Sequence, residues 1–212
     1  MTNNVEITLT VLAFILLFGY QIHFLVLMRR EPLRTSFGLM RKMRLLWVAS
    51  VRDSGERVLA VQTLRNWTMA ASFLASTAIL ISVGALNIVF RPENIAEIAQ
   101  SLNFFGSRDQ TFWIFKLMVL IVSFFFSFFN FTLAIRYYNH ASLMINVEPN
   151  KADETGDEQI AKVLHHGANH YSLGMRGYYV SIPLMLWLFG PIWLLLGVLV
   201  MVIVLYVLDR TV

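Results

Sequence analysis

Long apolar stretches alternate with polar segments along this chain, and the alternation predicts helices that cross a membrane. An α-helix needs about 20 apolar residues to cross the hydrocarbon core of a bilayer. Four stretches reach this length, at about residues 7–28, 67–90, 112–135 and 178–208. We therefore predict an all-α membrane protein with four transmembrane helices, organised as a single transmembrane domain over residues 1–212.

Composition supports this assignment and excludes several kinds of chemistry. Apolar residues make up 57% of the chain and charged residues 14%, whereas a soluble domain carries about 25% charged residues. There is no cysteine, which excludes disulfides, thiolate metal sites and cysteine nucleophiles. The opening MTNNVE has no positive charge and no small-residue cleavage site follows the first apolar run, so this run is predicted to be a retained helix.

The distribution of basic residues predicts how the chain is threaded. Residues 29–65 hold nine Lys and Arg against three acidic residues, and MTNNVE holds no basic residue. The positive-inside rule then places segments 29–66 and 136–177 in the cytoplasm. With four spans, both termini lie on the non-cytoplasmic side, and a bacterial inner (cytoplasmic) membrane fits this arrangement.

The polar segment after the first span contains a predicted helix of its own. Met40, Met43, Trp47 and Val51 recur at helical spacing beside the basic run at 41–44. A basic amphipathic helix with tryptophan on its apolar side is typical of the headgroup layer, where anionic lipid attracts it. We predict an interfacial helix here.

The last apolar run carries a break. Gly190 precedes Pro191, and Pro183 lies one to two turns earlier. Proline removes a backbone donor and clashes with the preceding turn, so a Gly-Pro kink is expected in the last span. Thirty-one residues make a helix of ~46 Å against a ~30 Å hydrocarbon core. The helix therefore either emerges from the bilayer or splits into two shorter pieces.

Small and hydroxylated residues recur every three or four positions in the second and third spans. Such faces let membrane helices approach closely, so the two spans are predicted to pack on each other through them. A hydrophilic pathway between the spans, or around an oligomer axis, is the alternative. The residues on these faces are Thr68, Ser72 and Ser76, and Ser123, Ser127 and Asn130.

Three motifs then carry a resemblance to a known family. They are QTLRNWTMAASFLAS from Gln62, IRYYNHASLMINV from Ile135 and GMRGYYVSIPLMLWLFGP from Gly174. In this order they resemble the multi-pass membrane family of bacteria and plants catalogued as domain of unknown function 599. The resemblance covers nearly the whole chain and implies a fold but no activity. It draws attention to residues expected to form one polar cluster at the cytoplasmic face: Arg65, Asn66, Arg136, Tyr137, Asn139, His140, Arg176 and Tyr179.

The HHGANH run contributes His165, His166 and His170 just before the last apolar stretch. Histidines four apart on a helix can ligate one metal, and a haem held by His23 and His140 is conceivable. However, Gly167 and Asn169 weaken a helix in this run, and HxxxH alone is a weak signal. We predict interfacial histidines without a tightly bound metal, and no cofactor.

The function predicted from these features is non-enzymatic. No Asp or Glu lies inside the four spans, which disfavours proton- and cation-coupled pumps, and no catalytic motif is present. The first hypothesis is an accessory or scaffold subunit of a membrane complex. The alternative is a homo-oligomeric channel or carrier for an anionic or polar solute, and the third is a metal- or haem-binding membrane protein. The expected partners are the lipid bilayer with its anionic headgroups and a second copy or another membrane protein, not nucleic acid.

Overall fold

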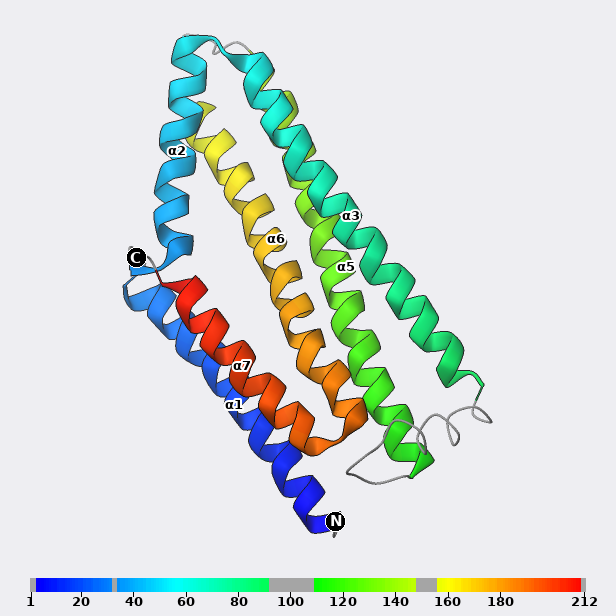
Figure 1. Ribbon diagram of the computed structural model, residues 1–212. Coiled ribbons are helices and arrows are strands. Elements are labelled where there is room, and N and C mark those ends of the chain that lie inside the picture. Colours follow the sequence, from blue (N-terminus) through cyan, green and yellow to red (C-terminus); the bar gives the residue numbers. More distant parts are fainter. Residues whose placement is uncertain (1–2, 32–33, 92–108, 148–155, 211–212) are drawn as a thin grey trace.

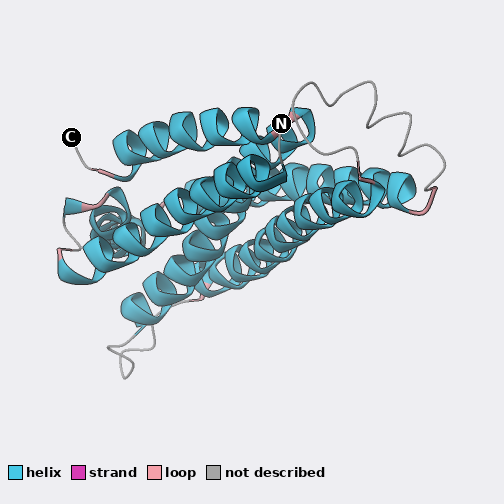
Figure 2. Cartoon of the chain, turned by 90° about the horizontal axis from the view of Figure 1, so that it is seen from below, coloured by secondary structure: helices cyan, strands magenta, loops and turns pink. Residues whose placement is uncertain are grey.

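The computed structural model describes residues 3–31, 34–91, 109–147 and 156–210. These residues form helices throughout (Figures 1 and 2), and among them the only β-type pairing is a single bridge between Thr35 and Arg210. The predicted all-α fold is therefore confirmed. The helices are α1 (Asn3–Arg30), α2 (Ser36–Ser54), α3 (Arg57–Val89), α5 (Gln110–Asn146), α6 (Gly156–Leu186), the short 3-10 helix η2 (Trp187–Phe189) and α7 (Pro191–Asp209).

Four of these helices are long and apolar enough to cross a bilayer. They are Asn4–Arg30, Arg57–Val89, Gln110–Asn146 and Pro191–Asp209, which confirms four candidate spans. Helix α3 packs along α5, α5 packs along α6, and α7 lies between α6 and α1. Each span buries only a minor part of its surface within the chain, so most of its surface faces outward.

The predicted fourth span, 178–208, is in fact two antiparallel helices. Helix α6 ends at Leu186, and α7 begins at Pro191 and runs back beside it (Figure 1). Gly190 makes the reversal with φ 136° and ψ 167°, a conformation that favours glycine. Pro191 then occupies the first turn of α7, where its missing N–H costs nothing. The break was predicted at the right place, but it turns the chain around instead of kinking one helix.

This reversal also decides where the ends of α1 and α7 lie in the bundle. The phenol of Tyr20, near the end of α1, donates a hydrogen bond of 2.7 Å to Asp209 at the end of α7. The end of α7 therefore lies beside the end of α1, while the start of α1 lies at the far end of the bundle (Figure 1). The prediction that both termini lie on the non-cytoplasmic side treats residues 178–208 as one crossing, and these residues instead form two antiparallel helices. The side of the membrane on which each terminus lies stays a prediction.

The predicted helix after the first span is present as α2. Thr35 caps its start by accepting a hydrogen bond from the Gly38 amide at 3.2 Å, and Gly55 ends it with φ 71°. The helix packs against α6. Its buried residues are Val48 and Val51. The buried face of α2 is therefore rotated about the helix axis relative to the apolar face predicted from Met40, Met43, Trp47 and Val51.

The predicted cytoplasmic segment 136–177 is largely helical rather than a loop. Helix α5 continues to Asn146 and α6 begins at Gly156, and the 37 residues of α5 make a helix of ~55 Å, longer than a ~30 Å hydrocarbon core. The C-terminal part of α5 and the N-terminal part of α6 form a second core with α2 and the start of α3. Its members include Val48, Leu64, Tyr138 and Leu164.

The polar faces of the second and third spans do not pack on each other. Helix α3 meets α5 through a stripe of small residues. Thr68, Ser72 and Ser76 lie to the side of this stripe: Thr68 and Ser72 are half-buried, and Ser76 is exposed. The Ser72 hydroxyl donates back to the Thr68 carbonyl, so it needs no partner on another helix. Small side chains on a helix face let two backbones approach closely. The stripe consists of Ala71, Ala75, Ala78, Ser82 and Ala85.

Ser123, Ser127 and Asn130 of α5 face α6 instead. The Ser123 hydroxyl donates to the Gly177 carbonyl at 3.0 Å, and a Cβ on Gly177 would lie 2.1 Å from the Ser127 hydroxyl oxygen. The glycine side of α6 therefore admits these polar side chains, and the interface is closely packed. Gly174 repeats the arrangement one turn earlier against Phe131.

Single cysteines in this cysteine-free chain test the reversal. Ser50→Cys and Arg210→Cys should respond alike to a membrane-impermeant thiol reagent in intact cells, because α2, which carries Ser50, starts at the bridge between Thr35 and Arg210. Gln110→Cys, at the start of α5, should respond oppositely. If Arg210→Cys instead behaves like Gln110→Cys, residues 178–208 cross the membrane once and the reversal is wrong.

A double substitution tests the α5–α6 contact. Gly177→Ala should destabilise the protein by ~1–3 kcal/mol, because its new methyl group collides with the Ser127 hydroxyl. Adding Ser127→Ala removes the colliding oxygen and should restore part of the loss. Thermal unfolding in detergent measures both variants, and a double variant as unstable as Gly177→Ala with Ser127 intact would contradict this contact.

Candidate functional site

A cavity of about 630 Å³ lies between α1, α2, α6 and α7, and we name it the arginine cavity. All four helices supply side chains to its wall. Helix α7 contributes to this wall because it folds back beside α6. Most of its wall is apolar, including Phe24, Leu25, Met28, Phe37 and Met40. Its polar members are Gln21, Ser36, Arg44, Asn169, Tyr171, Ser172, Arg176, Tyr179 and Asp209.

Arg176 of α6 is fully engaged with α1 and α7. One guanidinium nitrogen donates to the Gln21 amide oxygen at 2.9 Å, and another donates to Asp209 at 2.6 Å. The guanidinium lies over the Phe24 ring, 3.9 Å from its centre. The second carboxylate oxygen of Asp209 accepts the Tyr20 hydrogen bond. This network neutralises the Arg176 charge and ties three helices together.

Arg44 of α2 is the second arginine of the cavity wall, and its charge is not neutralised in this way. Its Nε and Nη2 atoms are buried and have no hydrogen-bond partner in the described part of the chain. The Oδ1 atom of Asn169, on the same wall, is likewise buried and unpartnered. Burial lowers the pKa of Arg44. Buried polar groups are normally satisfied, so these groups indicate a site that a ligand completes.

His165 lies next to this charge and is held neutral. Its ring packs on Phe37 with the ring centres 5.5 Å apart, and its Nδ1 atom is also buried, with no hydrogen-bond partner among the described residues. Burial, with the neighbouring Arg44, Arg41 and His166, lowers the pKa of His165 to about 4. A neutral imidazole adds no charge at physiological pH, so Arg44 remains the principal unpaired cation of the wall.

The other two histidines of the HHGANH run contact α5. Both rings stack on Tyr137 at 5.5 Å between centres, and His170 Nδ1 lies 3.0 Å from the side-chain oxygen of Asn130. Because the Asn130 amide nitrogen donates to the Phe126 carbonyl, its oxygen accepts and His170 donates from Nδ1. Burial and His166 lower the pKa of His170. Glycine and asparagine do not interrupt the helix here, because Gly167 fits against Tyr138.

No group of three or more His, Asp or Glu residues with metal-binding geometry is found in residues 3–31, 34–91, 109–147 and 156–210. His165 and His166 have ring centres 6.5 Å apart with tilted planes, and His170 is committed to Asn130 through one ring nitrogen. The three candidate ligands thus face Phe37, Tyr137 and Asn130 rather than a common point.

The structure divides the polar cluster expected from the family motifs. Arg176 and Tyr179 line the arginine cavity, whereas Tyr137 is turned toward the histidines of α6. The remaining members have exposed side chains on α3 and α5: Arg65, Asn66, Arg136, Asn139 and His140. The eight residues therefore do not meet at one place.

A second charged pair lies at the opposite end of the bundle. Lys116 of α5 and Glu6 of α1 are 3.3 Å apart and both side chains are buried. The ammonium group also lies 4.7 Å from the centre of the Phe112 ring and 5.5 Å from that of Trp187. This pair fastens the start of α1 to α5 and to the reversal. Removing one member would leave a buried charge, which is strongly destabilising.

Sequence reasoning missed Arg44, Gln21 and the pairing of Asp209. Arg44 stands in a basic run whose ordinary role is to set topology, and Asp209 lies just beyond the last apolar run. A signal for Arg44 was present, since it precedes Val48 by one turn and Val51 by two. No sequence signal joined Asp209 to Arg176, because that contact needs the reversal.

The lowered pKa of His165 predicts a pH dependence of stability. Between pH ~4 and ~6.5 the unfolded chain binds a proton at this position that the folded protein does not, so stability falls as the pH is lowered through this window. His165→Gln should weaken the loss in unfolding temperature between pH 7 and pH 5. His140→Gln, which changes an exposed ring, is the control. An unchanged pH profile for His165→Gln would contradict the assignment.

Comparison with known proteins gives a family and no relative of known structure. The family model described as "Protein of unknown function, DUF599" matches residues 8–212, nearly the whole chain. No curated protein and no solved structure matches the chain. The resemblance seen in the motifs is thereby confirmed: this chain is a member of the DUF599 family and an integral membrane protein.

Proposed function

We propose that the protein is a non-enzymatic membrane protein that binds the anionic headgroup of an amphiphile in the arginine cavity. The observation that carries this proposal is Arg44, whose Nε and Nη2 atoms are buried without an acceptor on the wall of a 630 Å³ cavity. A phosphate or carboxylate group offers two oxygens in the geometry that a guanidinium fork binds. Because both nitrogens are buried, binding in this way requires the Arg44 side chain to rotate toward the ligand.

The charges around the cavity favour an anion. Arg176 and Asp209 neutralise each other at 2.6 Å, and His165 is neutral, which leaves Arg44 as a net positive charge. Outside the wall, the same end of the bundle carries exposed basic side chains at Arg29, Arg30 and Arg41. Basic residues at the cytoplasmic surface attract anionic lipids, and we place this end in the cytoplasm of a bacterial cell on that ground.

The rest of the wall favours an amphiphile over a free anion. Phe24, Leu25 and Met28 come from the end of α1, where its apolar stretch meets the basic end, and Leu205 and Leu208 come from the matching end of α7. A small hydrated anion gains nothing from such a surface. A lipid has a charged group for Arg44 and apolar atoms for the remaining wall.

A binding role without catalysis also agrees with how the polar groups are used. The carboxylate of Asp209 accepts hydrogen bonds from Arg176 and Tyr20, so it is a poor general base. Apart from Arg44 and Arg176, the other polar side chains of the wall are hydroxyls and amides, with no paired base among those described.

We further propose that this lipid-binding protein acts as an accessory or scaffold subunit of a membrane complex. The supporting observation is the broad outward face of the spans, with large apolar side chains such as Phe73 and Phe129 exposed. A channel between helices receives less support, because the alanine and glycine faces of α3 and α6 pack closely on α5. Nothing in the arrangement of the histidines favours a metal or haem protein.

Lipid binding measured by native mass spectrometry tests the proposal. Wild-type protein in a non-ionic detergent should bind dioleoyl phosphatidylglycerol in preference to dioleoyl phosphatidylcholine. Arg44→Gln should weaken phosphatidylglycerol binding about ten-fold, because it removes a charge-assisted hydrogen-bond donor. Arg41→Gln, which removes an exposed charge on the same helix that does not line the cavity, should weaken it much less than Arg44→Gln does.

Two results would contradict this proposal. Equal phosphatidylglycerol affinity in wild type and Arg44→Gln would show that the cavity does not bind the headgroup. Inorganic phosphate that competes with the lipid at equal concentration would show that the ligand is a free anion and that the apolar wall plays no part.

A further inference from the structure

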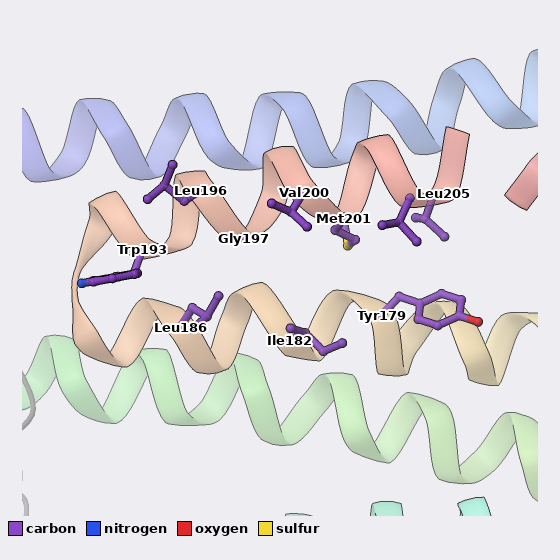
Figure 3. A pocket seen from close by; sticks show the side chains of 10 residues that line it. Tyr179, Ile182, Leu186, Trp193, Leu196, Gly197, Val200, Met201 and Leu205 are labelled. Atoms are coloured by element: carbon purple, nitrogen blue, oxygen red, sulfur yellow. The ribbon is translucent and has the colours of Figure 1, made fainter. Parts of the chain in front are cut away.

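A second, almost wholly apolar hollow of about 320 Å³ lies between α6 and α7, and we name it the α6–α7 groove. Figure 3 shows side chains of the two antiparallel helices lining it, with Ile182 and Leu186 on α6 opposite Leu196 and Val200 on α7. Ile182 and Val200 are 57% and 62% exposed. The groove is therefore open along its side, where the surrounding bilayer lies.

The α6–α7 groove and the arginine cavity adjoin each other and share part of their walls. Tyr179 and Leu205 line both of them. In Figure 3 the Tyr179 ring lies over the groove and its hydroxyl points along α6, away from Ile182 and Leu186. An amphipathic side chain at this point separates an apolar channel from a wall that bears charge. The arginine cavity and the α6–α7 groove together thus have the form of a headgroup site with an apolar extension.

We propose that the α6–α7 groove holds an acyl chain of the same lipid whose anionic headgroup lies in the arginine cavity. This inference rests on the proposed function and adds the ligand class: a membrane phospholipid with long chains, rather than any anionic amphiphile. The occupant follows from the shared wall of the two hollows and from their contrast, with Arg44 at one end and side chains without charge at the other.

The groove is somewhat longer than one leaflet. Trp193 and Leu205 mark its two ends on α7, and twelve residues of α-helix rise ~18 Å. Half of the hydrocarbon core of a bilayer is ~15 Å. Because α7 is long enough to cross the bilayer between Pro191 and Asp209, a chain entering from the arginine cavity would pass the middle of the membrane and approach the reversal at Gly190.

Physical chemistry sets how large the effect should be. An acyl chain that leaves the bilayer for an apolar groove gains no hydrophobic free energy, because both surroundings are apolar. It gains packing contacts only, so the groove should contribute a few-fold in affinity while Arg44 contributes more. The groove thus selects for chain length and the cavity selects for charge.

Chain-length dependence tests the inference. Native mass spectrometry should show that wild-type protein binds dipalmitoyl phosphatidylglycerol at least about three-fold more tightly than the dioctanoyl form. Ile182→Trp fills the groove and should abolish this preference while leaving dioctanoyl binding and its dependence on Arg44 intact. Ile203→Trp is the matched control, because Ile203 is 65% exposed on α7 but does not line the groove.

The possible failures are distinguishable. If long and short chains bind equally in wild type, or if Ile182→Trp keeps the preference, the groove does not hold the chain, although headgroup binding through Arg44 stands. If neither lipid depends on Arg44, the proposed function itself fails. Should Ile182→Trp not fold, Val200→Trp replaces it. A phospholipid with a photoreactive group in the middle of its chain must also cross-link wild-type protein within residues 179–205, and cross-links confined to α3 would overturn the inference.

Discussion

The reversal of the chain at Gly190 is the constraint on which the rest of the structure depends. It requires a backbone conformation with φ 136°, and the preceding Trp187 is fully buried against Phe14 of α1 and Phe112 of α5. Lys116 lies beside the same ring and pairs with Glu6. Contacts from two distant parts of the chain, α1 and α5, thus hold the turn in place, and α7 is directed back along α6 instead of continuing away from it.

The arginine cavity at the opposite end of the bundle depends on α7 running back along α6. Because α7 returns, Asp209 reaches Arg176 and Tyr20, and this bonded group joins α1, α6 and α7. Helix α2 then covers the junction and brings Arg44 to the wall without a counter-ion. The same return creates the apolar groove between α6 and α7. One charged cavity and one apolar hollow are therefore products of a single turn.

Sequence reasoning recovered the features that depend on local composition. The length of the apolar runs predicted four long helices, the helical spacing of apolar residues beside the basic run predicted α2, and Gly190 with Pro191 predicted a break. It did not predict the direction after the break, because a glycine–proline pair permits a kink or a reversal and the burial of Trp187 decides between them. Likewise, the helix through Gly167 persists because Tyr138 packs on that glycine, and the inward turn of Arg44 is set by how α2 rests on α6.

The most direct measurement is a cryo-electron microscopy structure of the protein, bound to a rigid antibody fragment, in nanodiscs of phosphatidylglycerol. Our account predicts density for a headgroup against Arg44 in the arginine cavity, continuous past Tyr179 with a chain along the α6–α7 groove. A map in which α7 continues away from α6, or in which both hollows are filled by protein side chains with no lipid density, would contradict it.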